Sequence, residues 1–247
     1  MQYQTQGLII KENTVGESDR VVTVLTRDEG LIRAFVKRAK AAKSRGTSAT
    51  SLLCYSLLTV YKGKEKNMIG DARPIKMFFG LESDIEALSL AQYFCELAGR
   101  FVPEGVKSEE YLRLILNALH FLTEKKKPHN LLKAAVEMRI LSLSGYMPNL
   151  IACDNCGEFL TEKMYFDIEK GILHCSDCGK ISVSSIECSK SIVTALRHTI
   201  YADFEKLFAF TLSDESLKKL SEITEHYAVS CIGYKLKTLE FYNRIKE

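Results

Sequence analysis

The chain has 247 residues, of which 46% are hydrophobic and 26% are charged. This length suits one large domain or two smaller ones, and the composition is that of a globular protein, which excludes a disordered or collagen-like chain. The longest uncharged apolar stretch, residues 51–61, is far shorter than the roughly 20 residues that span a bilayer. The amino terminus lacks a basic segment followed by an apolar one, so we expect no signal peptide and a cytoplasmic protein.

Positive charge is concentrated in the first third of the chain. The formal net charge is only +3, but residues 1–80 carry 14 Lys and Arg against 7 Asp and Glu, whereas residues 81–247 carry 20 against 24. This asymmetry predicts a nucleic-acid-binding domain at the amino terminus and a different role for the remainder. An uneven surface charge without function is the alternative.

Short runs of β-branched and aromatic residues fill the first 80 residues, and turn sequences that contain Gly16, Gly30 and Gly63 separate them. The expected strands are residues 8–10, 20–26, 31–37, 52–61 and 68–69. Five short strands in this length predict a five-stranded OB-fold barrel, although an open sandwich fits the same strand count.

After Pro74 the apolar residues recur at helical spacing. Helices are expected over residues 81–100, 111–123, 130–145, 190–202 and 213–246. Gly145 is expected to end the third helix, and Ser213 to cap the last one ahead of acidic residues in its first turn. We therefore expect an α+β protein with four parts: the barrel (1–80), a mainly α-helical domain in two pieces (81–150 and 181–247), and a cysteine-containing module (151–180) between them.

Four of the eight cysteines have the spacing of a metal site, Cys-x2-Cys-x18-Cys-x2-Cys. They are Cys153, Cys156, Cys175 and Cys178. Two thiolates separated by two residues can face one ion from a tight turn, and residues 164–167 and 171–174 are expected to be strands that return the second pair to the first. Because four thiolates fill the tetrahedral coordination of Zn²⁺ and leave no position for a substrate, the pattern predicts a structural zinc site.

Disulfides, a redox pair and a catalytic zinc site fit these four cysteines less well. Two disulfides require an oxidising compartment, a thioredoxin-like pair explains only one Cys-x-x-Cys, and a zinc deaminase keeps one coordination position open. His174, beside the third cysteine, is a candidate hydrogen-bond donor to the metal ligands, but it is interpreted as an exposed strand residue and is assigned no role. The remaining cysteines are expected to be packing residues: Cys54, Cys95, Cys188 and Cys231.

A run of cations begins on the third expected strand, with no acidic residue among them. They are Arg33, Lys37, Arg38, Lys40, Lys43 and Arg45. Strand alternation places Arg33, Phe35 and Lys37 on one face. Cations beside an aromatic ring are typical of a groove that binds single-stranded nucleic acid, because the cations contact the phosphate backbone and the ring stacks on bases. These cations and Phe35 therefore form the predicted DNA-binding site. The alternatives are a solvated loop and a Phe35 side chain turned into the core.

No catalytic motif is present in the sequence. Gly63-Lys64 and Gly179-Lys180 lack the other residues of a phosphate-binding loop, and neither HExxH nor GxSxG occurs. Residues 125–127, three lysines before Pro128, are interpreted as a solvated helix end. We expect a protein that is not an enzyme. A zinc-ribbon transcription or interaction factor and an enzyme with a structural zinc are the alternatives that stay open.

Two blocks of the sequence resemble the bacterial recombination and repair family RecO, in the expected order along the chain. The first block is residues 16–23 (GESDRVVT) with residues 25–26 and 30–45, and the second is residues 136–141 (VEMRIL) and 145–148 (GYMP), running into residues 153–157 (CDNCG). Where many relatives have a Lys-Gly-Ala-Arg step, this chain has Lys37-Arg38-Ala39-Lys40, which keeps the charge and removes a glycine.

The resemblance implies an amino-terminal OB-fold, a helical domain and an embedded four-cysteine zinc module. It also implies binding of single- and double-stranded DNA, annealing of complementary strands without nucleotide hydrolysis, and help in loading a recombinase onto strands coated with single-strand-binding protein. The implied partners are RecR and the C-terminal tail of single-strand-binding protein, whose pocket is expected on the helical domain without assigned residues. The expected location is the cytoplasm, at the nucleoid.

Overall fold

The computed structural model describes residues 1–37, 48–64, 66–178 and 181–246. By its internal contacts the chain divides into two compact units, residues 1–124 with 244–247, and residues 125–243. This grouping differs from the four predicted parts, which stay a prediction about folding domains. Among the described residues, no helix has the length and apolar character needed to cross a bilayer.

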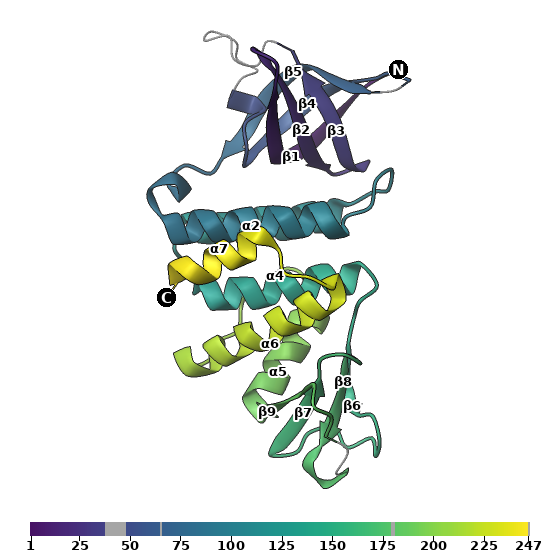
Figure 1. Cartoon of the computed structure of the whole chain (residues 1–247), viewed down its shortest axis with the longest axis vertical. Helices are drawn as coiled ribbons and strands as arrows, with labels where there is room; N and C mark the ends of the chain where they lie inside the picture. Colours follow the sequence, from purple (N-terminus) through teal and green to yellow (C-terminus); the bar gives the residue numbers. More distant parts are fainter. Residues whose placement is uncertain (38–47, 65, 179–180, 247) are drawn as a thin grey trace. The chain divides into compact units, whose positions relative to one another are not determined.

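The first unit contains a closed five-stranded barrel, which confirms the predicted α+β class with an amino-terminal barrel of the OB type (Figure 1). The strands are β1 (Gln2–Val15), β2 (Asp19–Thr26), β3 (Gly30–Val36), β4 (Cys54–Lys62) and β5 (Asn67–Met77). Their order is β1-β2-β3-β5-β4, the antiparallel pairing of β1 with β4 closes the barrel, and β3 runs parallel to β5.

Side-chain alternation along the strands builds the barrel core. On β3, Ile32, Ala34 and Val36 are buried in this core, and the residues between them face outward. Strands β1 and β5 are much longer than the predicted runs 8–10 and 68–69, because polar residues beyond each apolar run continue the ladder with neighbouring strands. Short apolar runs therefore located the buried part of these strands and missed their ends.

The first unit also holds a helical hairpin that is joined to the β2–β3 turn. Its elements are η1 (Leu81–Ser83), α2 (Ile85–Phe101) and α3 (Glu109–Thr123). Backbone hydrogen bonds between the turn and the α2–α3 loop are Leu31 N to Pro103 O (3.1 Å), Gly105 N to Glu29 O (2.8 Å) and Ser108 N to Arg27 O (2.9 Å). Main-chain groups form these bonds, so the backbones of the β2–β3 turn and the α2–α3 loop lie close together. This close approach requires that no side chain stands between them at the turn.

We expect Gly30→Ala to lower the free energy of unfolding of the first unit by more than about 2 kcal/mol. Gly30 has a φ of +63°, and a Cβ there would lie 2.0 Å from the Pro103 carbonyl oxygen. Gly16→Ala is the matched control, since Gly16 has a φ of +62° and nothing within 4 Å of its Cβ position. Urea denaturation of the full-length variants checks this prediction, and equal losses at the two positions would contradict it.

The second unit is built around α4 (His129–Leu143), which is buried almost along its whole length. The other helices are α5 (Lys190–Tyr201), α6 (Asp214–Ile232) and α7 (Lys237–Lys246), the last three residues of which are grouped with the first unit. Gly145, with a φ of +87°, follows the end of α4 as predicted, and Ser213 caps α6 by accepting a hydrogen bond from Ser216 N (3.3 Å). The prediction of one helix over 213–246 is wrong, because Gly233 adopts a φ of +85° and ends α6.

A buried charged cluster connects α4 to α6. Lys133 Nζ lies 2.9 Å from a carboxylate oxygen of Glu137 and 3.0 Å from one of Glu225, and the Lys133 side chain is 1% exposed. Lys133 also donates to Ser221 O (3.1 Å), and Thr224 Oγ1 donates to Glu137 (2.6 Å). The buried charges of Lys133 and Glu137 thus face each other, and the half-buried Glu225 supplies a second carboxylate to Lys133.

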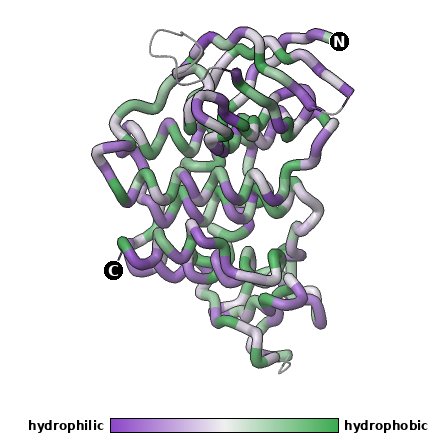
Figure 2. Tube along the Cα trace, turned by 45° about the horizontal axis from the view of Figure 1, so that its top comes forward, coloured by the Kyte–Doolittle hydropathy of each residue, from purple (hydrophilic) through white to green (hydrophobic). Residues whose placement is uncertain are grey.

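A four-stranded sheet of order β6-β8-β7-β9 completes the second unit. Its strands are β6 (Asn149–Cys153), β7 (Lys163–Asp167), β8 (Ile172–Cys175) and β9 (Ser185–Ser189), with η2 (Ser176–Cys178) after β8. Strands β7 and β8 agree with the two predicted strands to within one residue, whereas β6 and β9 were not predicted. In both units hydrophobic and hydrophilic residues alternate along the elements, as expected where one face is buried (Figure 2).

Candidate metal centre and nucleic-acid interface

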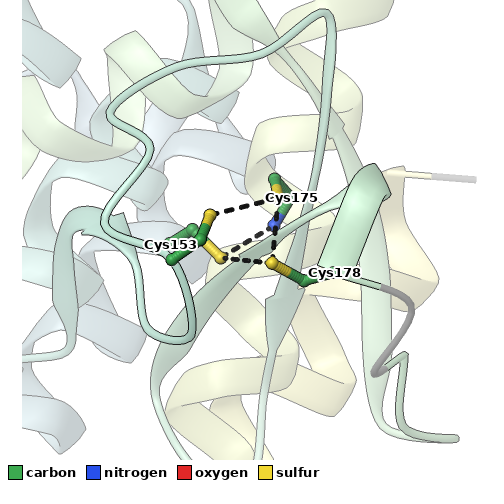
Figure 3. A group of neighbouring side chains, drawn as sticks. Cys153, Cys175 and Cys178 are labelled. Carbon is green, nitrogen blue, oxygen red and sulfur yellow. Dashed lines mark hydrogen bonds between the residues drawn. The ribbon is translucent and has the colours of Figure 1, made fainter.

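The four cysteines of the predicted metal site come together in the second unit. Cys153 ends β6, Cys156 lies in the turn that follows, Cys175 ends β8, and Cys178 ends η2. Their Sγ atoms all lie within 4.8 Å of one another. Figure 3 shows Cys153, Cys175 and Cys178 pointing toward one another from β6, β8 and η2. Cys153 and Cys175 are buried, Cys178 is half-buried and Cys156 is exposed.

The sulfur positions match the geometry of a tetrahedral thiolate site. Neighbouring Sγ atoms are 3.7 Å apart for Cys153 and Cys178, 3.6 Å for Cys156 and Cys175, and 3.4 Å for Cys175 and Cys178. A tetrahedral ion with metal–sulfur bonds of about 2.3 Å requires sulfur separations of about 3.8 Å. These three separations lie within a few tenths of an ångström of that value, and all separations are below 4.8 Å, so the cluster can hold a metal ion after small shifts of its side chains.

The electrostatics of the thiols also favour a bound cation. Burial opposes ionisation of Cys153, but hydrogen bonds from the backbone N–H groups of Cys156, Cys175 and Asn155 outweigh it and lower the pKa of Cys153. For Cys156 the backbone N–H of Glu158 favours the thiolate, yet the neighbouring thiol groups outweigh it and raise its pKa. Ionisation of one thiol thus disfavours ionisation of its neighbours, because the thiolates repel one another. A divalent cation offsets this repulsion.

His174 is buried, so its interpretation as an exposed strand residue is wrong. Its side chain is on β8, which pairs with β6 on one side and β7 on the other, and the residue is 6% exposed. Neighbouring residues Leu173, His174 and Cys175 are all buried, so both faces of β8 are covered, and no local pattern in the sequence predicts this. Of the four remaining cysteines, Cys54, Cys95 and Cys188 are buried as expected and Cys231 is half-buried.

The predicted DNA-binding residues that the structure describes lie on and directly after β3, where Arg33 and Phe35 share the outward face of the strand and Lys37 follows its end. Arg33 and Lys37 are exposed, and Phe35 between them is half-buried instead of turned into the core. Among the described residues, no carboxylate forms an ion pair with Arg33 or Lys37. The other predicted residues, Arg38, Lys40, Lys43 and Arg45, lie outside the described ranges. The DNA-binding role of all seven stays a prediction.

A groove of about 640 Å³ runs beside Arg33 and Phe35. Its walls include Asn67 of β5, Lys62 at the end of β4, and Lys64 and Lys66 of the connection between these strands. Lys66 Nζ lies 4.9 Å from the centre of the Phe35 ring, which is a cation–π distance. Glu29 and Glu104 also line the groove, and Glu29 pairs with Lys62 at 3.7 Å. The lysines outnumber these acids, so the groove favours an anionic ligand.

An apolar row crosses three strands beside this groove. Phe35 pairs with Met68, and Met68 pairs with Tyr61, so the three side chains leave the same face of β3, β5 and β4. Tyr61 is 47% exposed, and its ring lies against Gly70, where a Cβ would be 2.2 Å from Cε2 of Tyr61. A second hollow of about 540 Å³ on the Tyr61 side shares the same three lysines.

Sequence reasoning missed Tyr61, Met68 and the three lysines. The signal was present as Tyr61-Lys62 followed by Lys64 and Lys66, but Gly63-Lys64 was compared only with phosphate-binding loops. Only the β3–β5 pairing shows that this segment lies beside Phe35, because the two are about 30 residues apart in the sequence.

Comparison with known proteins finds matches along nearly the whole chain. The family model described as Recombination protein O N terminal matches residues 1–78, and the model described as Recombination protein O C terminal matches residues 82–240. A protein named DNA repair protein RecO from Acetivibrio thermocellus is 29% identical over 238 residues, which cover 96% of this chain and 95% of that protein. Proteins of the same name from Dehalococcoides mccartyi strain 195 (30% identical; 88% and 86% covered) and Desulforudis audaxviator (29%; 96% and 92%) are similarly related.

Proposed function

This chain belongs to the RecO family of DNA repair proteins, and on that premise we propose that it is a non-enzymatic, DNA-binding recombination mediator. It binds single- and double-stranded DNA, anneals complementary strands and assists recombinase loading onto strands coated with single-strand-binding protein. Its partners are then RecR and the C-terminal tail of single-strand-binding protein, in the cytoplasm at the nucleoid. The observation that carries the DNA-binding part is the cationic groove beside Phe35 on the barrel.

The barrel groove supplies the two interactions that single-strand binding needs. Arg33, Lys37 and the lysines at positions 62, 64 and 66 neutralise phosphates, while Phe35 and Tyr61 offer ring faces to unpaired bases. Neutralising the phosphates lowers the repulsion between two strands, so complementary strands can approach and pair without an energy source. The row of Phe35, Met68 and Tyr61 favours strands whose bases are unstacked.

We propose that the four cysteines hold a structural Zn²⁺. The donor set is all sulfur, the sulfur separations fit a tetrahedral ion, and four ligands leave no position for a reacting group. Zinc would supply folding free energy to the small sheet around it. Cys153 and Cys175 would attach the ion to β6 and β8.

A zinc-ribbon factor that binds DNA through the module is the second candidate, and charge disfavours it. Residues 151–180 carry three lysines and six acidic residues. Two of the lysines are already paired, Lys163 with Glu187 at 3.1 Å and Lys170 with Asp167 at 3.7 Å. The barrel is therefore the better DNA-binding surface.

Two barrel variants are expected to change DNA binding in different ways. Replacing Lys62, Lys64 and Lys66 with Ala should weaken single-strand binding. It should also make the slope of log affinity against log salt concentration shallower by about 2, since each phosphate contact contributes about 0.7 to this slope. Replacing Phe35 and Tyr61 with Ala should weaken binding by about 1–3 kcal/mol per lost stacked base without changing the salt slope. Fluorescence anisotropy over a salt series measures both quantities. Replacing Lys37, Arg38, Lys40 and Lys43 with Ala should likewise weaken DNA binding and flatten its salt dependence.

The matched control replaces Lys218 and Lys219, exposed lysines of α6 in the second unit, with Ala. Strand annealing is followed in parallel with and without ATP, and it should fall with DNA binding in the barrel variants and be independent of ATP in all of them. Unchanged DNA binding in both barrel variants would overturn the proposed site. A requirement for ATP would overturn the non-enzymatic mechanism.

A further inference from the structure

The first cysteine loop is the segment of residues 150–159, which carries Cys153 and Cys156. Arg197 of α5 contacts the backbone of this loop at three carbonyl groups. Its Nε donates to Leu150 O (2.7 Å), and its Nη2 donates to Ile151 O (3.0 Å) and to Phe159 O. The guanidinium carbon also lies 4.0 Å from the centre of the Phe159 ring. A single side chain thus holds two separate stretches of one loop.

These carbonyl groups lie on both sides of the first pair of metal-binding cysteines. Leu150 and Ile151 precede Cys153, and Phe159 follows Cys156, so the guanidinium fixes the entry and the exit of the loop that presents both thiols. Within the loop, Cys153 N donates to Glu158 O (2.8 Å), which shapes the turn itself. Arg197 attaches that turn to a helix.

The two cysteine pairs are supported differently. Cys175 is on β8, which pairs with strands on both of its sides, and Cys178 follows it directly on η2, so the second pair starts from the centre of the sheet. The first loop is connected to the sheet less continuously, because the register of β6 against β8 is interrupted between Asn149 and Cys153. The side chains of Ile151 and Phe159 are 62% and 58% exposed and do not bury the loop. The position of Cys156 therefore depends strongly on the Arg197 contacts.

We infer that Arg197 is a positioning residue for the metal, which holds the first cysteine loop in its ligating conformation and slows release of the ion. This inference rests on the proposed zinc site. An ion held by four thiolates leaves as its ligands detach one by one, and the exposed Cys156 is the ligand best placed to detach first. With both ends of its loop fixed, a detached Cys156 stays close to the ion and rebinds. Lysine is a poor substitute, because its single ammonium cannot reproduce the planar fork that reaches three carbonyls.

The test compares zinc release from the full-length wild-type protein and from Arg197→Lys. Zinc-loaded protein is mixed with an excess of a chromophoric chelator, and the absorbance of the zinc–chelator complex gives the release rate. We expect release about 10-fold faster from Arg197→Lys, as is typical when groups that orient metal ligands are replaced. Hydrogen exchange should increase in residues 150–159 and not in α4.

Arg139→Lys is the matched control for a general loosening of the helices. Arg139 is 9% exposed and its donors bind the carbonyl oxygens of Thr199 (3.0 Å) and Ala202 (2.7 Å), at the carboxyl end of α5 and away from the cysteine loop. Equal acceleration of zinc release by the two variants, or none by Arg197→Lys, would overturn the role of Arg197. A wild-type protein purified without zinc would instead overturn the zinc proposal, so the two failures are distinguishable.

Discussion

Removal of the metal is expected to unfold the four-stranded sheet of residues 149–189 and to leave the barrel folded. Structural zinc contributes roughly 10–16 kcal/mol of folding free energy in small zinc-binding peptides, which is as large as the whole stability of a typical domain. Without the ion, the thiols of Cys153 and Cys156 keep only their hydrogen bonds, and β6 keeps an interrupted pairing with β8. We therefore expect either excess chelator or Cys153→Ser to cause this loss.

Metal content by mass spectrometry and hydrogen exchange by peptide provide the measurement. Exchange should become fast in β6, β7, β8 and β9 and stay slow in β1 to β5. Cys231→Ser is the control for loss of a thiol, because Cys231 lies on α6 outside the cluster and is half-buried. Protection of the small sheet that survives complete metal removal would show that it folds on its own core, and would contradict this prediction.

Lys133→Met is expected to lower the free energy of unfolding of the second unit by about 3–5 kcal/mol at pH 7. Methionine has a similar shape to lysine, so the main change is loss of the ammonium that lies 2.9 Å from Glu137 and 3.0 Å from Glu225. The Glu137 carboxylate, which is 0% exposed, is then a buried charge without its counter-charge. Hydrogen exchange of α4 and α6 measures the loss.

The double variant Lys133→Met/Glu137→Leu is the control, because it removes both fully buried charges, leaves only the 18% exposed Glu225, and should recover much of the lost stability. A double variant as unstable as the single one would show that packing, and not the unpaired charge, explains the effect. A further check is the pH dependence. Burial opposes ionisation of Glu225, but Lys133, together with Asn243 and His226, outweighs it and lowers the Glu225 pKa.

The sign of the pH effect follows from this lowered pKa. The contribution of Glu225 to stability is present above the unfolded glutamate pKa of about 4.3 and is lost as the pH falls through the lower folded value. The stability difference between the wild type and Lys133→Met should therefore shrink below about pH 4. A difference that is constant down to pH 3 would be inconsistent with the buried ion pair as its cause.

Some features of the fold required information from distant parts of the chain. The predicted break after residue 145 and the cap at Ser213 depend on the local chemistry of glycine and serine, and both are confirmed. The end of α6 at Gly233 was missed, because apolar residues at helical spacing continue past it. Strands β6 and β9 were missed since each is a short edge strand, which is ordered only by pairing with β8 or β7.

The sequence by itself determined the short strands of the first 80 residues, the paired cysteines and the run of cations that begins on β3. Each of these follows from local spacing: alternation on a strand, two residues between paired thiols, and unbalanced charge in a short segment. Only the tertiary structure decided that Tyr61, Met68 and the lysines at 62, 64 and 66 lie beside Phe35, that His174 is buried, and that Arg197 holds the first cysteine loop. The physical reason is that these relations are contacts between residues far apart in the chain, which form when strands pair and helices pack, and no local pattern encodes them.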